Sequence, residues 1–215
     1  MTGKGSLNHN SRKFHAKNTD PNRTHWNVEY CNEDIKDVYH ELFDDALKRY
    51  NDKQTRKDRK IDDYYEKIRS GKQEKLFHEV ILQIGDKDNM GSETMEGQLA
   101  AKILDEYMKG FQERNPTLRV FAAHLHLDEA TPHLHIDFVP FTTGSKRGLD
   151  TRVSLKQALA AQGFKGGSRG DTEWSQWVLS EKERLAAVME RYGIEWEQKG
   201  THEKHLSVLD YKKQE

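Results

Sequence analysis

The chain has 215 residues, of which 34% are hydrophobic and 33% charged, and this composition suits one globular domain with a packed core. No apolar run reaches the roughly 20 residues that a membrane-spanning helix needs, and no signal peptide opens the chain, so we expect a soluble cytoplasmic protein without membrane contact. The single cysteine, Cys31, excludes an internal disulfide, and a formal net charge of −1 does not by itself indicate nucleic-acid binding.

The first thirty residues are polar and rich in turn-forming residues, and only residues 26–30 alternate as a short strand would. This basic stretch contains the tetrapeptide HNSR at residues 9–12, followed by Lys13. Taken alone, His9 is typical of a loop histidine without a chemical role. A balanced total charge can nevertheless hide a local basic surface of this kind.

Two amphipathic helices are predicted next, on either side of a basic connector. Apolar residues recur at helical spacing over residues 32–51, beginning at an Asn N-cap, and again over residues 61–69. The connector, residues 53–60, is rich in Lys and Arg, although such a charge run more often forms only a solvated face.

A mostly buried strand is predicted over residues 76–85, and a long helix begins near Ser92 and ends at Asn115-Pro116. A β-hairpin, residues 119–141, follows this helix. The order strand, helix, hairpin predicts an α+β fold with a mainly antiparallel central β-sheet flanked by helices.

The hairpin is the most informative part of the sequence, because apolar side chains alternate with His and Asp along both of its strands. Side chains two apart on a strand share a face. One face is therefore apolar, and the other gathers His124, His126, His133, His135 and Asp137.

Three of these imidazoles predict a metal site on the hairpin. If the register brings His126 opposite His133 or His135, three ring nitrogens converge on one point, and three protein ligands with open positions are typical of a catalytic metal centre. Asp128 and Glu129 in the turn add carboxylates, of which Glu129 is the better candidate to approach the metal. His124, Asp128 and Asp137 are expected to contact the ligating histidines without binding the metal themselves.

After the hairpin the chain is expected to turn over residues 142–148 and to form a short strand over residues 149–153. Helices are predicted over residues 154–162 and 172–192, separated by a glycine-rich basic loop. The helical spacing of the tryptophans in the last helix favours core packing over base stacking.

The hairpin motif, His126 to His135, resembles the HxDExxPHxH signature of the MobV (Pre/Mob) relaxases, a branch of the HUH endonucleases. The HNSR tetrapeptide is similar to the HNxR element of the same family. This resemblance implies an enzyme that nicks one DNA strand at a transfer origin and starts mobilisation of a plasmid or integrative element. It also implies a divalent metal, Mn²⁺ or Mg²⁺, held by His126, His133 and His135.

The resemblance further implies that His9 is the nucleophile, which attacks the scissile phosphorus and forms a covalent 5′-phosphoryl-histidine intermediate. Glu129 would orient a ligand or accept a proton. Arg12 would grip phosphate. Further DNA contacts are expected from Lys13, Arg56 and Arg59.

The expected partner is single-stranded or hairpin origin-of-transfer DNA, with accessory transfer proteins bound through a C-terminal region beyond this chain. We expect one relaxase domain over residues 1–215, with a core of about residues 1–145 and a helical extension over about residues 154–215. Residues 207–215 are predicted to begin a helix that is cut short, and the chain is expected to be part of a longer protein.

Three other functions compete with this hypothesis. A rolling-circle replication initiator would use a tyrosine nucleophile, for which Tyr64, Tyr65 and the weaker Tyr30 are candidates, although helical spacing favours packing for the first two. A metal-stabilised DNA-binding module would hold the origin without cutting it. A metal hydrolase of small molecules would have an apolar pocket and no affinity for single-stranded DNA.

Overall fold

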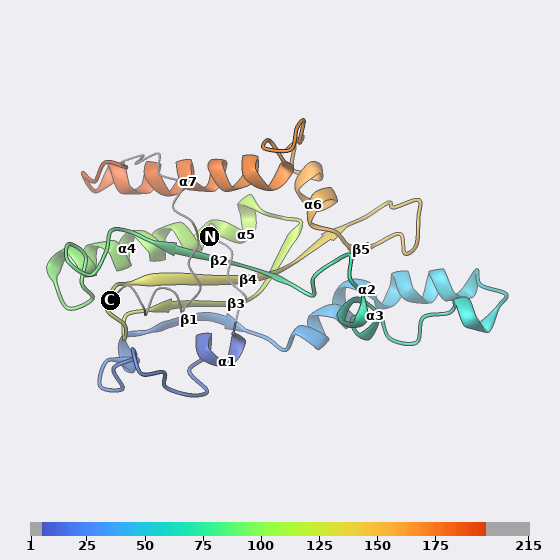
Figure 1. Cartoon of the computed structure of the whole chain (residues 1–215), viewed down its shortest axis with the longest axis horizontal. Helices are drawn as coiled ribbons and strands as arrows, with labels where there is room; N and C mark the ends of the chain where they lie inside the picture. The colour runs from blue at the N-terminus through green and yellow to red at the C-terminus, as the bar shows by residue number, and fades with distance from the viewer. Residues whose placement is uncertain (1–5, 197–215) are drawn as a thin grey trace.

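The computed structural model describes residues 6–196, and the helix predicted to begin at residues 207–215 lies outside this part (Figure 1). The helices are α1 (Leu7–Asn10), α2 (Ile35–Asp52), α3 (Tyr64–Ser70), α4 (Met95–Lys109), α5 (Phe111–Arg114), α6 (Leu155–Ala161) and α7 (Glu173–Arg191). Two 3-10 helices are η1 (Thr24–Trp26) and η2 (Lys57–Arg59). The strands are β1 (Val28–Asn32), β2 (His78–Gln83), β3 (Leu118–His126), β4 (His133–Thr142) and β5 (Arg152–Val153).

The strands form one antiparallel sheet in the order β1-β3-β4-β2, with β5 paired to the far end of β4. This architecture confirms the predicted α+β class with a central antiparallel sheet. The hairpin register places His124 opposite His135 and His126 opposite His133. Since directly opposed residues share a face, the histidines of both strands meet on one side of the sheet.

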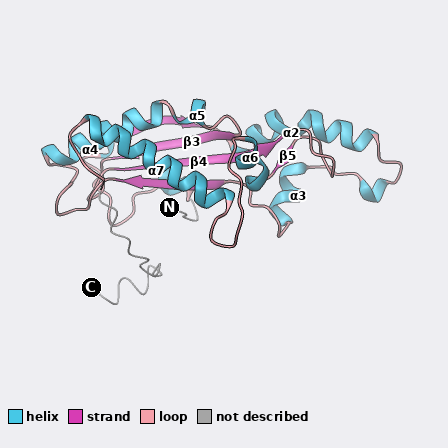
Figure 2. Cartoon of the chain, turned by 90° about the horizontal axis from the view of Figure 1, so that it is seen from above, coloured by secondary structure: helices cyan, strands magenta, loops and turns pink. Residues whose placement is uncertain are grey.

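The other side of the sheet is apolar and carries the main core. Leu134, Ile136 and Phe138 of β4 are fully buried there, under α4 and α5 together with α6 and α7, as Figures 1 and 2 show. Trp177 of α7 is 1% exposed within the same core, and its indole Nε1 donates to Asn115 Oδ1 at 2.7 Å. The expectation that Trp177 is a core residue is therefore confirmed.

A second core cluster lies where α2 and α3 pack against the sheet. A bulge in β3 between Val120 and Ala122 turns Phe121 to this side, where Tyr64 of α3 is also buried. The Tyr64 hydroxyl accepts the Val153 backbone N–H at 3.2 Å. Tyr64 is therefore a packing residue, as its helical spacing predicted, and its hydroxyl is not presented to a substrate.

Several predicted element boundaries are wrong, and local hydrogen bonds explain the shifts. Asn32 belongs to β1, and the N-cap of α2 is Asp34, whose carboxylate accepts the Lys36 backbone N–H. Ser92 does not start α4, because its hydroxyl donates to the Glu129 carbonyl and so ties the hairpin turn. Thr94 is the N-cap of α4, and the helix breaks at Gly110 before α5. The one-turn helix α1 was not predicted.

Candidate active site on the polar face of the sheet

Three imidazoles converge on the polar face, as the hairpin pattern predicted. His126, His133 and His135 each offer one ligand atom, and these atoms lie within 4.8 Å of one another. His126 Nδ1 is 3.3 Å from His133 Nε2, and the rings of His126 and His135 have centroids 4.8 Å apart. The cluster has the geometry of a three-histidine metal site with further coordination positions left for solvent or substrate.

Each ring also has a second nitrogen that points away from the cluster to a fixed acceptor. His126 Nε2 lies 2.8 Å from the Asn10 carbonyl, His133 Nδ1 2.8 Å from the Thr131 carbonyl, and His135 Nδ1 2.8 Å from Glu79 Oε1. Donation of these N–H groups leaves a lone pair on the inward nitrogen of each ring. His135 Nε2 is buried and has no hydrogen-bond partner, so the donor set fits a metal ion.

Burial keeps the rings of His126 and His133 in the neutral form that binds metals. Burial lowers the pKa of His126 to about 2, with help from the positive charge of Arg12. The pKa of His133 is also lowered, again mainly by burial. Neutral imidazole is the ligand form, so no proton has to leave these two rings before a metal binds near neutral pH.

The helix α1 brings His9 to the edge of this cluster. Figure 1 shows α1 on the opposite side of the sheet from α4 and α7, and the ring centroids of His9 and His126 lie 6.1 Å apart. His9 Nε2 is 3.3 Å from Glu129 Oε1 and 3.3 Å from Arg12 Nη1. Burial is the main cause of a lowered His9 pKa, so the ring is held in the neutral form that a nucleophile requires.

Arg12 anchors the turn after α1. Its guanidinium donates from Nε and Nη2 to the two carboxylate oxygens of Asp128, at 2.9 and 2.6 Å, and from Nη2 to Glu129 at 2.8 Å. Burial raises the pKa of Asp128, but the hydrogen bonds and the positive charge of Arg12, together with a hydrogen bond to Asn27, outweigh it and lower that pKa to about 2. The positive φ of Arg12, 52°, is held by these contacts. In this arrangement Arg12 holds the segment that carries His9, and its contact with phosphate stays a prediction.

Glu129 lies between His9 and the three-histidine cluster. Its Oε1 is 3.7 Å from His133 Nε2, and its Oε2 accepts from Asn18 Nδ2 at 2.5 Å. Asp128 is fully buried and committed to Arg12. Of the two turn carboxylates, Glu129 is therefore the one next to the candidate ligands.

His124 and Asp137, which were expected to support the metal ligands, have different surroundings. His124 Nε2 contacts Glu29 at 3.2 Å, and its ring centroid lies 6.1 Å from that of His126, outside the three-histidine cluster. Asp137 accepts from Asn10 Nδ2 at 3.1 Å. Burial, and then the neighbouring charge of Glu79, raise the pKa of Asp137 to about 7.

Two residues of this site were missed by sequence reasoning. Asn10 is 2% exposed and Glu79 is 4% exposed, and Asn10 Nδ2 donates to Glu79 Oε1 at 2.8 Å. The signal for Glu79 was a carboxylate in a mostly apolar strand, where an acidic residue is rare unless it is paired. Its meaning depended on the pairing of β2 with β4, which sets Glu79 opposite Asp137.

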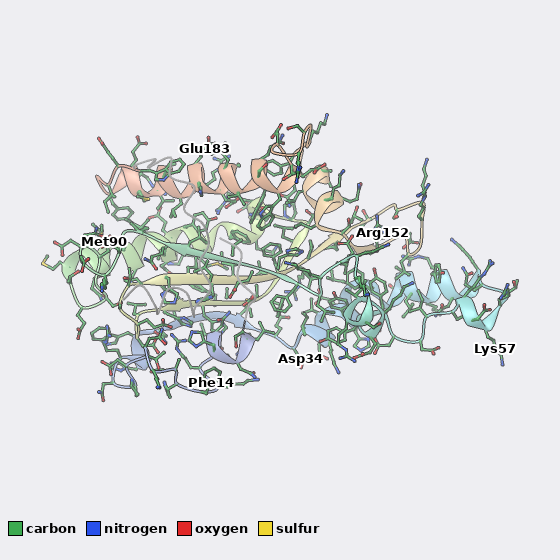
Figure 3. The ribbon with its side chains drawn as sticks, in the orientation of Figure 1. Phe14, Asp34, Lys57, Met90, Arg152 and Glu183 are labelled. Atoms are coloured by element: carbon green, nitrogen blue, oxygen red, sulfur yellow. The ribbon has the colours of Figure 1, made fainter. Side chains whose placement is uncertain are left out.

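The three predicted DNA-contacting cations lie outside the cluster. Lys13 is exposed in the turn after α1. Arg56 is exposed and pairs with Asp58 at 2.7 Å, and Arg59 ends η2. Figure 3 labels Lys57, the residue after Arg56, at the far end of the projecting segment that carries α2 and η2, here called the arm. Phe14, whose ring centroid lies 5.9 Å from that of His9, is remote from this end of the arm. The structure therefore does not bring Arg56 and Arg59 to the histidine cluster.

The rival tyrosine nucleophiles have no access to this cluster. The Tyr30 hydroxyl donates to Asp105 at 2.9 Å, and Tyr65 packs against Tyr39 with ring centroids 5.2 Å apart.

Across residues 6–196 no helix combines the length and the apolar character needed to cross a membrane.

Comparison with protein families gives one match that spans nearly the whole chain. The family described as plasmid recombination enzyme (Mob_Pre) matches residues 5–213. A plasmid recombination enzyme of Streptococcus agalactiae is 26% identical over 159 residues, which are 71% of this chain and 28% of that protein. The chain thus spans less than a third of the length of this relative.

Solved structures of similar fold are MobM relaxase domains (MOBV; Mob_Pre) bound to plasmid pMV158 oriT DNA, with Mn bound. The complex with 22-nucleotide DNA at pH 5.5 is 25% identical, with a TM-score of 0.55, and the match covers 97% of this chain and 91% of that one. A complex with 23-nucleotide DNA at pH 6.5 is also 25% identical, with a TM-score of 0.52 and coverage of 97% and 88%.

Proposed function

Since this chain belongs to the plasmid recombination enzyme (Mob_Pre) family, we propose that it is a relaxase, a metal-dependent endonuclease that nicks one strand at the transfer origin of a plasmid or integrative element. The family prediction from the hairpin motif is confirmed by the match over residues 5–213. The observation that carries the proposed activity is the convergence of three buried imidazoles with His9 and Glu129 at their edge.

His126, His133 and His135 would hold the metal through the ring nitrogens that face one another. The Mn-bound MobM relaxase domains support manganese, with magnesium as the alternative. Once bound, the ion would neutralise negative charge on the non-bridging oxygens of the scissile phosphate.

His9 would supply the nucleophile. Its neutral ring attacks the scissile phosphorus, the new bond joins nitrogen to phosphorus, and the bond from phosphorus to the DNA 3′ oxygen breaks. The products are a 5′-phosphoryl-histidine and a 3′-hydroxyl that takes its proton from solvent. Arg12 Nη1, 3.3 Å from His9 Nε2, favours the tautomer with a lone pair on that nitrogen. With the lone pair on Nε2 the ring proton is on Nδ1, so Glu129, whose Oε1 lies 3.3 Å from Nε2, would hold a ligand of the metal; it would accept a proton from His9 only if the ring carried that proton on Nε2.

The substrate would be single-stranded or hairpin oriT DNA; the MobM complexes contain plasmid pMV158 oriT DNA of 22 and 23 nucleotides. Lys13 lies beside the nucleophile and would contact phosphates near the nick. Arg56 and Arg59 would contact DNA that lies away from the nick, because the arm holds them far from the histidines. Residues 1–215 would form one relaxase domain with a helical C-terminal extension, and accessory transfer proteins would bind beyond it. A cytoplasmic location stays a prediction.

A nicking assay on a labelled single-stranded oriT oligonucleotide with Mn²⁺ tests the proposal. The wild-type chain, His9→Ala and His133→Ala are compared, and covalent products are separated on a denaturing protein gel. We expect an acid-labile protein–DNA adduct that is absent from both variants. An adduct that persists in His9→Ala would refute the histidine nucleophile. Tight DNA binding without any cleavage by the wild type would instead indicate a non-cleaving DNA-binding module.

A further inference from the structure

Asn10 and Glu79 lie beneath the histidine cluster, and the chemistry proposed above gives neither of them a role. Both side chains are almost fully buried, at 2% and 4% exposed. They come from distant parts of the chain, α1 and the edge strand β2, and they meet at the point where α1 contacts the sheet. A buried carboxylate and a buried amide in contact need a structural or a chemical reason.

Glu79 fixes the orientation of one candidate ligand. Its Oε1 accepts from His135 Nδ1 at 2.8 Å and from Asn10 Nδ2 at 2.8 Å. A carboxylate can only accept at Nδ1, so the ring proton of His135 is held there and the lone pair stays on Nε2. That nitrogen is the buried atom without a partner, and it faces the other two imidazoles.

Asn10 links Glu79 to a second candidate ligand, His126, and to the proposed nucleophile, His9. Its Nδ2 also donates to Asp137 Oδ2 at 3.1 Å, so one amide bridges carboxylates on β2 and β4. The backbone carbonyl of Asn10 accepts from His126 Nε2 at 2.8 Å, which leaves His126 Nδ1 free to bind metal. Asn10 directly follows His9 in α1. It therefore contacts both Glu79, which supports His135, and His126 itself, and its position determines where α1 places His9.

We propose that Glu79 and Asn10 are positioning residues that couple α1, the segment carrying His9, to the metal-binding histidines. Metal binding and docking of α1 then stabilise each other, since such coupling is reciprocal. This inference rests on the proposed metal site, and the experiments below separate its failure from the failure of that proposal.

Mn²⁺ affinity of the intact 215-residue chain tests the role of Glu79, measured by isothermal titration calorimetry. Glu79→Gln is expected to weaken Mn²⁺ binding by about 10- to 100-fold, the usual effect of removing a carboxylate behind a ligating histidine. Glu29→Gln is the matched control, because Glu29 contacts His124, which lies outside the three-histidine cluster. Glu29→Gln should bind Mn²⁺ as the wild type does.

Equal Mn²⁺ affinity in Glu79→Gln and the wild type would overturn the inference and leave the relaxase proposal intact. A wild-type chain that does not bind Mn²⁺ would overturn the metal proposal itself, and this inference with it. A nitrogen-15 NMR spectrum of the wild-type histidines needs no variant that folds. We expect His135 protonated at Nδ1 before Mn²⁺ is added, and protonation at Nε2 would refute the role of Glu79.

Hydrogen exchange of α1 tests the role of Asn10. The amide protons of Ser11 and Lys13 bond to carbonyls of Leu7 and Asn8, so they report the integrity of this turn. In the wild type, saturating Mn²⁺ should slow their exchange, and in Asn10→Ala this protection should be lost. Asn8→Ala, an exposed position of the same helix, should retain it. Equal Mn²⁺ protection in Asn10→Ala and the wild type would show that α1 is not coupled to the metal.

Discussion

The two faces of β4 differ in almost every physical respect although they alternate along one strand. Leu134, Ile136 and Phe138 point into a mainly apolar core under the helices α4 and α7, where the indole Nε1 of Trp177 is paired with Asn115. His135 and Asp137 point the other way and keep buried polar atoms without hydrogen-bond partners. Unsatisfied buried atoms destabilise a fold, and a metal ion would supply the partner that His135 Nε2 lacks. Over residues 133–138 the strand thus turns the main core and the candidate site to opposite faces.

The strongest test of this difference between the two faces of β4 is to truncate one side chain on each face. Phe138→Ala should lower the free energy of unfolding by about 3 to 5 kcal/mol, because it leaves a cavity among α5, α7 and the sheet. Its folded fraction should bind Mn²⁺ with wild-type affinity. Chemical denaturation and Mn²⁺ calorimetry below the unfolding midpoint measure both effects.

His135→Ala is the counterpart on the polar face. It should abolish measurable Mn²⁺ binding while changing the metal-free unfolding free energy far less than Phe138→Ala does, because the loss of the hydrogen bond from Nδ1 to Glu79 is offset in part by removal of the orphaned Nε2. If His135→Ala destabilises the metal-free chain as much as Phe138→Ala, then the polar face is part of the structural core and the separation of roles is wrong.

His78 sharpens the comparison because it is an imidazole on the apolar side. Its ring stacks on Phe138, with centroids 6.1 Å apart, and lies 6.0 Å from Trp174. Burial lowers the pKa of His78 from 6.5 to about 4. The fold therefore favours the neutral ring, and this stabilisation is complete above pH 6.5 and is lost as the pH falls towards 4.

His78→Phe should remove that pH dependence. The pKa difference corresponds to a loss of up to about 3 kcal/mol between pH 6.5 and 4 in the wild type, which denaturant unfolding at several pH values can measure. The buried histidines of the cluster contribute to both proteins, so the difference between wild type and variant isolates His78. Parallel pH profiles for the two proteins would contradict a buried neutral His78.

Those parts of the fold that depend on local periodicity could be predicted from the sequence. The alternation in the hairpin predicted which side chains face the core, and the HxDExxPHxH pattern predicted the three converging imidazoles. Helix starts were less predictable, because Ser92 and Thr94 are equally good N-caps and only the tertiary contact of Ser92 with the Glu129 carbonyl decides between them.

Contacts that join distant segments could not be predicted. Glu79 supports His135 only because β2 pairs with β4 in one register, and a shift of one residue would turn its carboxylate into the apolar core. Arg12 was expected to grip phosphate, and the structure shows it bound to Asp128, 116 positions away. The partners of these side chains follow from topology and not from residue type.

The arm beyond the sheet provides the smallest expected effect and tests whether chemistry is confined to the polar face. Arg56 is exposed, and within residues 6–196 it pairs only with Asp58, two residues away. Arg56→Ala should therefore leave the unfolding midpoint and Mn²⁺ affinity unchanged. If the arm contacts DNA, the variant should lower the slope of log affinity for oriT DNA against log salt by about 0.7 to 0.9, the value of one phosphate contact.

Arg184→Ala, exposed on α7 across the sheet, is the matched control and should keep the wild-type slope. Equal slopes for all three proteins would exclude Arg56 from the proposed DNA-binding surface and leave DNA recognition to the segment that carries His9 and to the polar face.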